Sequence, residues 1–284
     1  MPDFKTDDGV RIYYEEVGSG FPVIFAHEFG DNYQSFGPQL GHFARRYRCI
    51  AYAARGYPPS DVPEDASKYS MGRVVADIGA LMDHLGFAQA HLVGLSMGSF
   101  YVLNFALANP ARARSLVIGS CGAGVTTDPE QQKLRLAAVE ERARLYEELG
   151  SEVMADRMAN LAVRRTFKAK DPHGWAAFRE RLKQHSAEGC ARMLRGIFCN
   201  RPSVYDQREQ LRACTIPTLL MFGDDDGPSI APTLFMREQM PRAGLTVFPY
   251  SGHNLNIEEP AAFNRAVDDF LHAVELGRWN YAAS

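Results

Sequence analysis

The sequence has no long apolar run, no strong excess of charge and no paired cysteines. No segment approaches the roughly 18 consecutive apolar residues of a membrane-spanning helix, and Met1 to Gly9 is too polar for a signal peptide. The formal net charge of -3 excludes a broad basic surface for nucleic acid or an anionic membrane. The five cysteines are scattered and form no C-x-x-C motif, which argues against zinc and redox centres. We therefore expect a cytoplasmic protein without nucleic-acid or membrane partners.

Short apolar runs alternate with helical patterns along most of the 284 residues. Val10 to Val17, bounded by glycine-containing turns, indicates the second arm of an N-terminal hairpin. The buried runs typical of parallel strands are residues 22–26, 49–52, 91–93, 115–118, 218–222 and 245–248. Helical spacing occurs at residues 34–43, 73–85, 99–108 and 260–274. This alternation predicts a doubly wound α/β core.

One segment interrupts the alternation. Residues 127–205 are helical in pattern throughout, with candidate helices at 129–149, 153–162, 175–185 and 187–198. We interpret this segment as a helical cap over one edge of the sheet, and we assign residues 1–126 and 206–284 to the core.

Ser96 stands between two glycines in the segment Gly94 to Gly98, where a buried strand is followed directly by a helix. Such a sharp turn forces its central residue into a strained backbone conformation and leaves room only for small neighbours. It also places the helix N-terminus, with its free N–H groups, beside the serine oxygen. The serine is thus a candidate nucleophile, the alternative being a serine that caps the helix.

The segment resembles the nucleophile elbow G-x-S-x-G of the α/β-hydrolase superfamily. In that family the order along the chain is serine, acid, histidine. Residues 223–228 resemble its acid turn and residues 250–254 its histidine turn, which makes Asp226 the acid and His253 the base. The resemblance implies an eight-stranded, mostly parallel sheet with helices on both faces and a helical cap.

Alternatives to two members of this triad stay open. Asp224 or Asp225 would be the acid if the loop were shifted by a residue, and three consecutive aspartates are also typical of a solvated turn. No carboxylate stands at residues 119–122, after the strand where some hydrolases place the acid. Of the seven other histidines, only His27 also lies at the carboxyl end of a predicted strand.

Residues 25–30 resemble the family's oxyanion loop, H-G-x. The resemblance implies that the backbone N–H groups of Phe29 and Met97 stabilise a negatively charged oxygen. We interpret His27 as a residue that fixes this loop by hydrogen bonds, with a role as base the alternative. Glu28 stands where glycine is usual, a departure similar to the loops of 3-oxoadipate enol-lactonases and related esterases. Two interpretations stay open for Glu28: it pairs with Arg55, or it faces solvent.

Four residues are candidates for substrate contact, namely His27, Glu28, Cys121 and Trp175. Cys121 lies just past the strand at 115–118 and also fits a buried structural thiol. Trp175 lies in the cap with other apolar residues that either line an acyl site or pack the cap onto the core. Arg164, Arg165, Lys168 and Lys170 form a basic cluster that would attract a carboxylate-bearing substrate or simply face solvent.

The resemblance implies acyl transfer through a serine-bound intermediate, with no metal or organic cofactor. Ser96 excludes the branches that use an aspartate nucleophile. We expect a serine hydrolase that cleaves a small carboxylic ester or lactone. The alternatives are an acyltransferase, a perhydrolase or a C–C bond hydrolase with the same triad, or a receptor for a small ligand.

Overall fold

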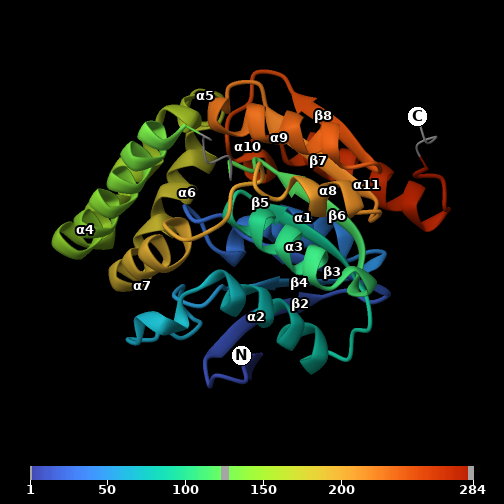
Figure 1. Cartoon of the computed structure of the whole chain (residues 1–284), viewed down its shortest axis with the longest axis horizontal. Coiled ribbons are helices and arrows are strands. Elements are labelled where there is room, and N and C mark those ends of the chain that lie inside the picture. Colours follow the sequence, from blue (N-terminus) through green and yellow to red (C-terminus); the bar gives the residue numbers. More distant parts are fainter. Residues whose placement is uncertain (1, 123–127, 281–284) are drawn as a thin grey trace.

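The computed structural model describes residues 2–122 and 128–280, and its centre is an eight-stranded sheet in the order β1-β2-β4-β3-β5-β6-β7-β8 (Figure 1). The strands are β1 (Asp3–Lys5), β2 (Arg11–Val17), β3 (Phe21–Ala26), β4 (Tyr47–Tyr52), β5 (Ala90–Leu95), β6 (Ala113–Gly119), β7 (Thr218–Gly223) and β8 (Ala243–Phe248). β2 pairs antiparallel with β1 and β4, whereas the pairs from β4 to β8 are parallel. The predicted hairpin and mostly parallel sheet are confirmed.

Side chains of the parallel strands alternate between two cores, because neighbouring residues of a strand point to opposite faces. Ile24 and Leu92 lie in the core that includes α2 (Met71–His84) and α3 (Met97–Ala108). Val23 and Val93 lie in the core that includes α1 (Gly37–Phe43) and α11 (Pro260–Glu275). Each such burial contributes roughly 1.5–3 kcal/mol. The four core helices lie close to their predicted positions, on both faces of the sheet.

Three further helices of the core are not evident from the sequence pattern: α8 (Arg208–Ala213), α9 (Gly227–Gln239) and α10 (Leu255–Glu258). α8 and α10 have six and four residues, too few to establish a helical period. α9 begins at Gly227-Pro228 and contains Pro232, residues that favour turns.

The helical insertion comprises α4 (Pro129–Ala159), α5 (Arg165–Lys170), α6 (Pro172–Lys183) and α7 (Ala187–Met193), followed by a π-helical turn at Leu194–Phe198. α4, α6 and α7 form a group beside the core, at the left of Figure 1. α4 is kinked at Gly150, whose φ is 74°, which agrees with two separately predicted helices in this region. The predicted boundary at residue 127 lies outside the described residues. No helix in the described ranges is long and apolar enough to cross a membrane.

Candidate active site

The three predicted catalytic residues follow the carboxyl ends of parallel strands: Ser96 follows β5, Asp226 follows β7 and His253 follows β8. Ser96 has φ 50° and ψ -108°, a backbone conformation that L-residues rarely adopt. Its N–H donates to the carbonyl of Gly119 on β6 at 2.8 Å, which holds the turn against the sheet. The predicted strained turn is confirmed.

The glycines on both sides of Ser96 are required by close backbone contacts. A Cβ at Gly94 would approach the carbonyl group of Gly98 at 2.5 Å, and a Cβ at Gly98 would collide with the carbonyl oxygen of Ala26. Since Ala26 ends β3, the start of α3 packs directly against the loop that contains His27 and Glu28. The elbow and the predicted oxyanion loop are therefore in contact.

His253 and Asp226 form a hydrogen-bonded pair. Nδ1 of His253 lies 2.9 Å from Oδ2 of Asp226, whose side chain is fully buried. Asp224 and Asp225 are exposed, so the hydrogen bond distinguishes Asp226 from the two alternatives. Burial alone would raise the pKa of Asp226, but the charge of His253 and its hydrogen bond lower the pKa below its ordinary value.

The surroundings of His253 favour its protonated form. Burial alone would lower the pKa of His253, but the charge and hydrogen bond of Asp226 and the charge of Glu28 outweigh it, with Arg164 opposing them. The net result is a pKa above the ordinary value. The Asp226 hydrogen bond also fixes the proton on Nδ1, so that Nε2 of the neutral ring is free to accept a proton.

His27 fixes the oxyanion loop through both ring nitrogens. Nδ1 lies 2.7 Å from the carbonyl oxygen of Glu28, and Nε2 accepts from the N–H of Ala54 at 3.1 Å. These bonds require the neutral ring with its proton on Nδ1, and burial lowers the pKa of His27 to about 4. They agree with the interpretation of His27 as a loop-fixing residue and leave no ring nitrogen for substrate.

Phe29 is held in the same loop by Tyr57, whose hydroxyl donates to the Phe29 carbonyl at 2.9 Å. The Phe29 ring packs edge-on against Phe198 of the insertion, with centroids 5.2 Å apart. Within residues 2–122 and 128–280, no protein atom accepts a hydrogen bond from the N–H of Phe29 or Met97. Both groups have the chemistry expected of oxyanion donors.

Both interpretations of Glu28 left open above are wrong. Glu28 is 1% exposed, and its Oε2 accepts from Nη2 of Arg164 at 2.7 Å. Its Oε1 accepts from Nδ2 of Asn254, the residue after His253. Arg55 instead binds Asp77 and Asp8, with N–O distances of 2.6 and 3.0 Å. A carboxylate in this loop is thus neutralised from the insertion, by a residue 136 positions away in sequence.

Sequence reasoning also missed a second ion pair between the insertion and the same loop. Arg181 of α6 donates to both carboxylate oxygens of the buried Asp31, at 2.8 Å each. The carbonyl of Val163 accepts from the N–H of His253 at 2.9 Å. The insertion therefore positions both the oxyanion loop and the histidine loop. Ion pairs that join distant segments leave no periodic signal in the sequence.

The other two candidates for substrate contact, Trp175 and Cys121, have protein neighbours of their own. The indole N–H of Trp175 donates to the carbonyl of Ala159 at 2.9 Å, and Lys168 lies over its ring at 4.2 Å. Both contacts are within the insertion and favour a packing role. Cys121 is fully buried after β6. It lies near Arg201, where burial lowers the pKa of the guanidinium to about 10 while Cys121 acts in the opposite direction.

The predicted basic cluster is mostly engaged by protein groups. Arg164 binds Glu28, Lys170 binds Glu258 and Glu259 at 2.9 and 2.6 Å, and Lys168 binds Asn160. Arg164 and Lys170 are thus bound by carboxylates of the protein, whereas Arg165 and Lys168 are exposed.

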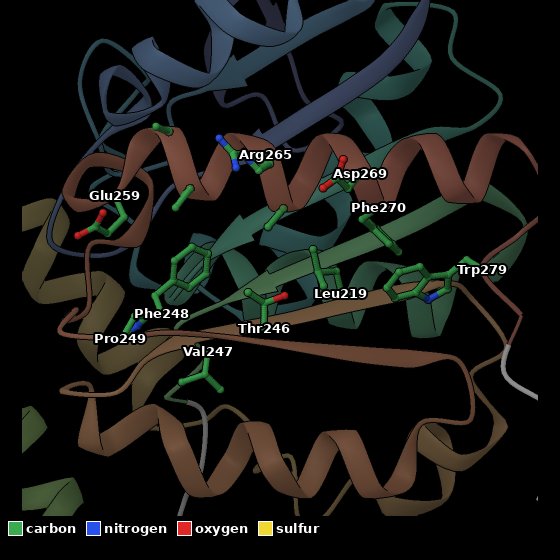
Figure 2. Close-up of a pocket in the computed structure, with 13 residues that line it drawn as sticks. Leu219, Thr246, Val247, Phe248, Pro249, Glu259, Arg265, Asp269, Phe270 and Trp279 are labelled. Carbon is green, nitrogen blue, oxygen red and sulfur yellow. The ribbon is translucent and has the colours of Figure 1, made fainter.

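A groove of about 740 Å³ lies between β8, α11 and Trp279 (Figure 2). Its lining includes the buried apolar residues Leu219 and Phe248 from the strands and Phe270 from α11, and the exposed Arg265 and Asp269 of α11. None of Ser96, Asp226 and His253 lines it. The groove is separate from the candidate active site.

Comparisons with known proteins agree with this fold. A model of the alpha/beta hydrolase family matches residues 21–266. The chain belongs to this family.

Its relatives include enzymes with several named substrates. The chain is 30% identical to 3-oxoadipate enol-lactonase 2 of Acinetobacter baylyi over 94% of this chain and 95% of that protein. It is 27% identical to 2-hydroxymuconate semialdehyde hydrolase of Pseudomonas putida over 93% and 91% of the two chains. A solved esterase of Thermogutta terrifontis superposes with a TM-score of 0.85 at 25% identity, covering 96% and 99%. The chain thus belongs to a hydrolase family, and its relatives act on esters, enol-lactones and other small molecules.

Proposed function

We propose that this protein is a serine hydrolase that cleaves a small carboxylic ester or lactone through an acyl-enzyme. Ser96 is the nucleophile, His253 the general base and acid, and Asp226 the residue that orients the histidine. The observation that carries the proposal is the hydrogen bond between His253 and the buried carboxylate of Asp226. A histidine held in this tautomer accepts a proton at Nε2, as serine activation requires.

In acylation, Oγ of Ser96 attacks the substrate carbonyl while His253 takes the serine proton. The oxyanion accepts hydrogen bonds from the N–H groups of Phe29 and Met97. His253 then donates its proton to the leaving alkoxide. In deacylation, His253 takes a proton from water, the resulting hydroxide attacks the acyl carbonyl, and the proton returns to Ser96. No metal or organic cofactor takes part.

The test is turnover of a panel of esters, lactones and thioesters, led by a fluorogenic short-acyl ester. Ser96→Ala is expected to lower kcat by roughly 10⁴ or more, because the remaining groups cannot replace the nucleophile. Ser99→Ala is the matched control: this serine lies on the same helix and donates to the Gly119 carbonyl at 2.7 Å. Activity that survives in Ser96→Ala contradicts the proposal, as does tight ligand binding without turnover, which supports a receptor.

C–C bond hydrolysis is a second candidate, favoured by the similarity to 2-hydroxymuconate semialdehyde hydrolase. Including that semialdehyde in the panel separates the two reactions. Turnover of the semialdehyde without turnover of any ester or lactone supports the second candidate. Addition of an alcohol or hydrogen peroxide as a competing acyl acceptor likewise reveals acyl transfer or perhydrolysis.

A further inference from the structure

A second carboxylate faces His253 on the side away from Asp226. Oε2 of Glu28 lies 3.8 Å from Nε2 of His253, the nitrogen that exchanges protons in acyl transfer. The Glu28 side chain is 2% exposed and that of His253 14%. At this distance and burial the charge of the carboxylate is weakly screened by solvent. Glu28 therefore acts on the histidine electrostatically.

Glu28 is held in this position by Nη2 of Arg164 and by Asn254. Nη2 of Arg164 binds Glu28, its Nε donates to Oδ1 of Asn254 at 3.0 Å, and its Nη1 donates to the carbonyl of Met158 at 2.9 Å. Nδ2 of Asn254 donates to the other oxygen of Glu28. Every nitrogen of the guanidinium and both oxygens of the carboxylate are thus engaged, which holds the carboxylate in one position.

The charged groups packed around His253 come from four parts of the chain: Asp226 after β7, Glu28 after β3, Arg164 from the insertion, and Glu258 of α10 with its partner Lys170. Glu258 accepts from the N–H of Gly252 at 3.0 and 3.1 Å and supports the backbone of the histidine loop. Among the described carboxylates, only those of Asp226 and Glu28 lie within 4 Å of an imidazole nitrogen of His253.

We propose that Glu28 is a positioning residue of this site, whose carboxylate stabilises the imidazolium form of His253 while Arg164 holds that carboxylate in place. The role rests on the proposed function, in which His253 becomes an imidazolium in both acylation and deacylation. The carboxylate also lies close to the oxyanion donors, where its charge would oppose the oxyanion. Arg164 offsets that charge, so the insertion contributes to the charge balance of the site.

The pH dependence of kcat/KM tests the role, because its acid limb reports the pKa of the free enzyme's base. Glu28→Gln removes the negative charge with little change of shape. It is expected to lower the pKa of His253, so activity persists to lower pH and the acid limb moves down by about one pH unit. Arg164→Met removes the positive charge and is expected to move the limb upward. Glu28→Gln is the deciding variant, and an acid limb that does not move in the folded Glu28→Gln protein overturns the proposal.

Asp31→Asn is the matched control. Asp31 is also buried in the oxyanion loop and also pairs with an arginine of the insertion, but its partner is Arg181 and it does not contact His253. This variant disturbs the same loop without removing the charge at Nε2. Its acid limb is expected to coincide with that of the wild type, and a shift equal to that of Glu28→Gln overturns the proposal in favour of a general loop effect.

The proposal can also be tested without turnover, by NMR titration of His253 in the Ser96→Ala background. The Cε1–H signal is assigned by its loss in a further His253→Gln variant. Adding Glu28→Gln is expected to lower the titration midpoint of His253 by about one pH unit. If the protein hydrolyses no ester but Glu28→Gln still lowers the titration midpoint of His253, the proposed function fails and this role of Glu28 stands. An unchanged midpoint overturns the role even if the protein proves to be an esterase.

Discussion

Arg55 and Arg164 are both buried arginines that bind carboxylates, but their networks differ in composition. Arg55 binds two carboxylates: Nε and Nη2 lie 2.7 and 2.6 Å from Asp77, and Nη1 lies 3.0 Å from Asp8. It also donates to the carbonyl of Lys68 at 2.6 Å. Arg164 binds one carboxylate, that of Glu28, which in turn faces His253.

The Arg55 network is structural, whereas the Arg164 network includes the candidate active site. Arg55 ties the N-terminal turn and the loop after β4 to α2, all within the core, and its partners face no group of the triad. Arg164 ties the insertion to the oxyanion and histidine loops. We therefore expect substitutions at Arg55 to act on stability and substitutions around Arg164 to act mainly on the acid–base behaviour of His253.

The largest expected effect is the loss of stability in Arg55→Met. Removal of one partner of a buried ion pair leaves uncompensated charge, here on Asp77 and Asp8, and typically costs about 3–5 kcal/mol. Urea unfolding measures the change, and kcat/KM of the folded fraction is expected to stay near the wild-type value. Arg48→Met is the control, because its ion pair with Glu16 is partly exposed and such pairs contribute about 1 kcal/mol or less. A loss in Arg55→Met no larger than in the control contradicts the structural role.

A smaller loss of stability is expected at acid pH, where Asp8 becomes protonated. Burial alone would raise the pKa of Asp8, but hydrogen bonds from Arg55 and Thr6 and the charges of Arg55 and Arg73 lower it well below its ordinary value. The folded-state pKa is thus below the unfolded value of about 3.9. The contribution of Asp8 is therefore complete above that value and is lost as the pH falls through the folded-state pKa.

Asp8→Asn is expected to lose about 2 kcal/mol at pH 7 and to show a weaker decline in stability toward acid than the wild type. Urea unfolding at several pH values measures both. Asp7→Asn serves as the control, since the neighbouring carboxylate is 76% exposed and is expected to change the acid slope little. Parallel stability curves for Asp8→Asn and the wild type would show that Asp8 does not carry the acid dependence.

Most of the core could be predicted from the sequence because its strands and turns depend on residues that are close together along the chain. Buried runs such as residues 22–26 and 218–222 have the period and length of strands, and Gly94 and Gly98 mark a turn that only small residues permit. The pairing of Asp226 with His253 was implied by the resemblance of residues 223–228 and 250–254 to the acid and histidine turns of the α/β-hydrolase family. The exposure of Asp224 and Asp225, which decides the acid, became visible only in the folded loop.

The environment of Glu28 could not be predicted, because it depends on a contact between distant segments. Arg55 was the nearest cation on a neighbouring strand-end loop, which made it a reasonable but wrong partner. Arg164 belonged to a cluster of four cations with no feature that separated a buried member from exposed ones. The fold buries Arg164 to 2% exposure and leaves its neighbour Arg165 exposed. Ion-pair partners follow from tertiary packing rather than from spacing.

The smallest expected effect comes from Gly30→Ala, which tests the position of Arg164 without removing any charge. A Cβ at residue 30 would collide with Nη2 of Arg164 and approach Oε2 of Glu28 at 3.3 Å, so the end of the arginine side chain must move. Because no charge is removed, the loss of stability is expected to stay below about 2 kcal/mol. The weakened hold on Glu28 is expected to lower kcat/KM about tenfold, as small displacements near reacting groups do. Gly41→Ala is the control, because a Cβ there would have no heavy atom within 4 Å. If Gly30→Ala keeps full activity, catalysis does not require the Arg164 guanidinium at this position. Arg55 and Arg164 would then differ only in their contributions to stability.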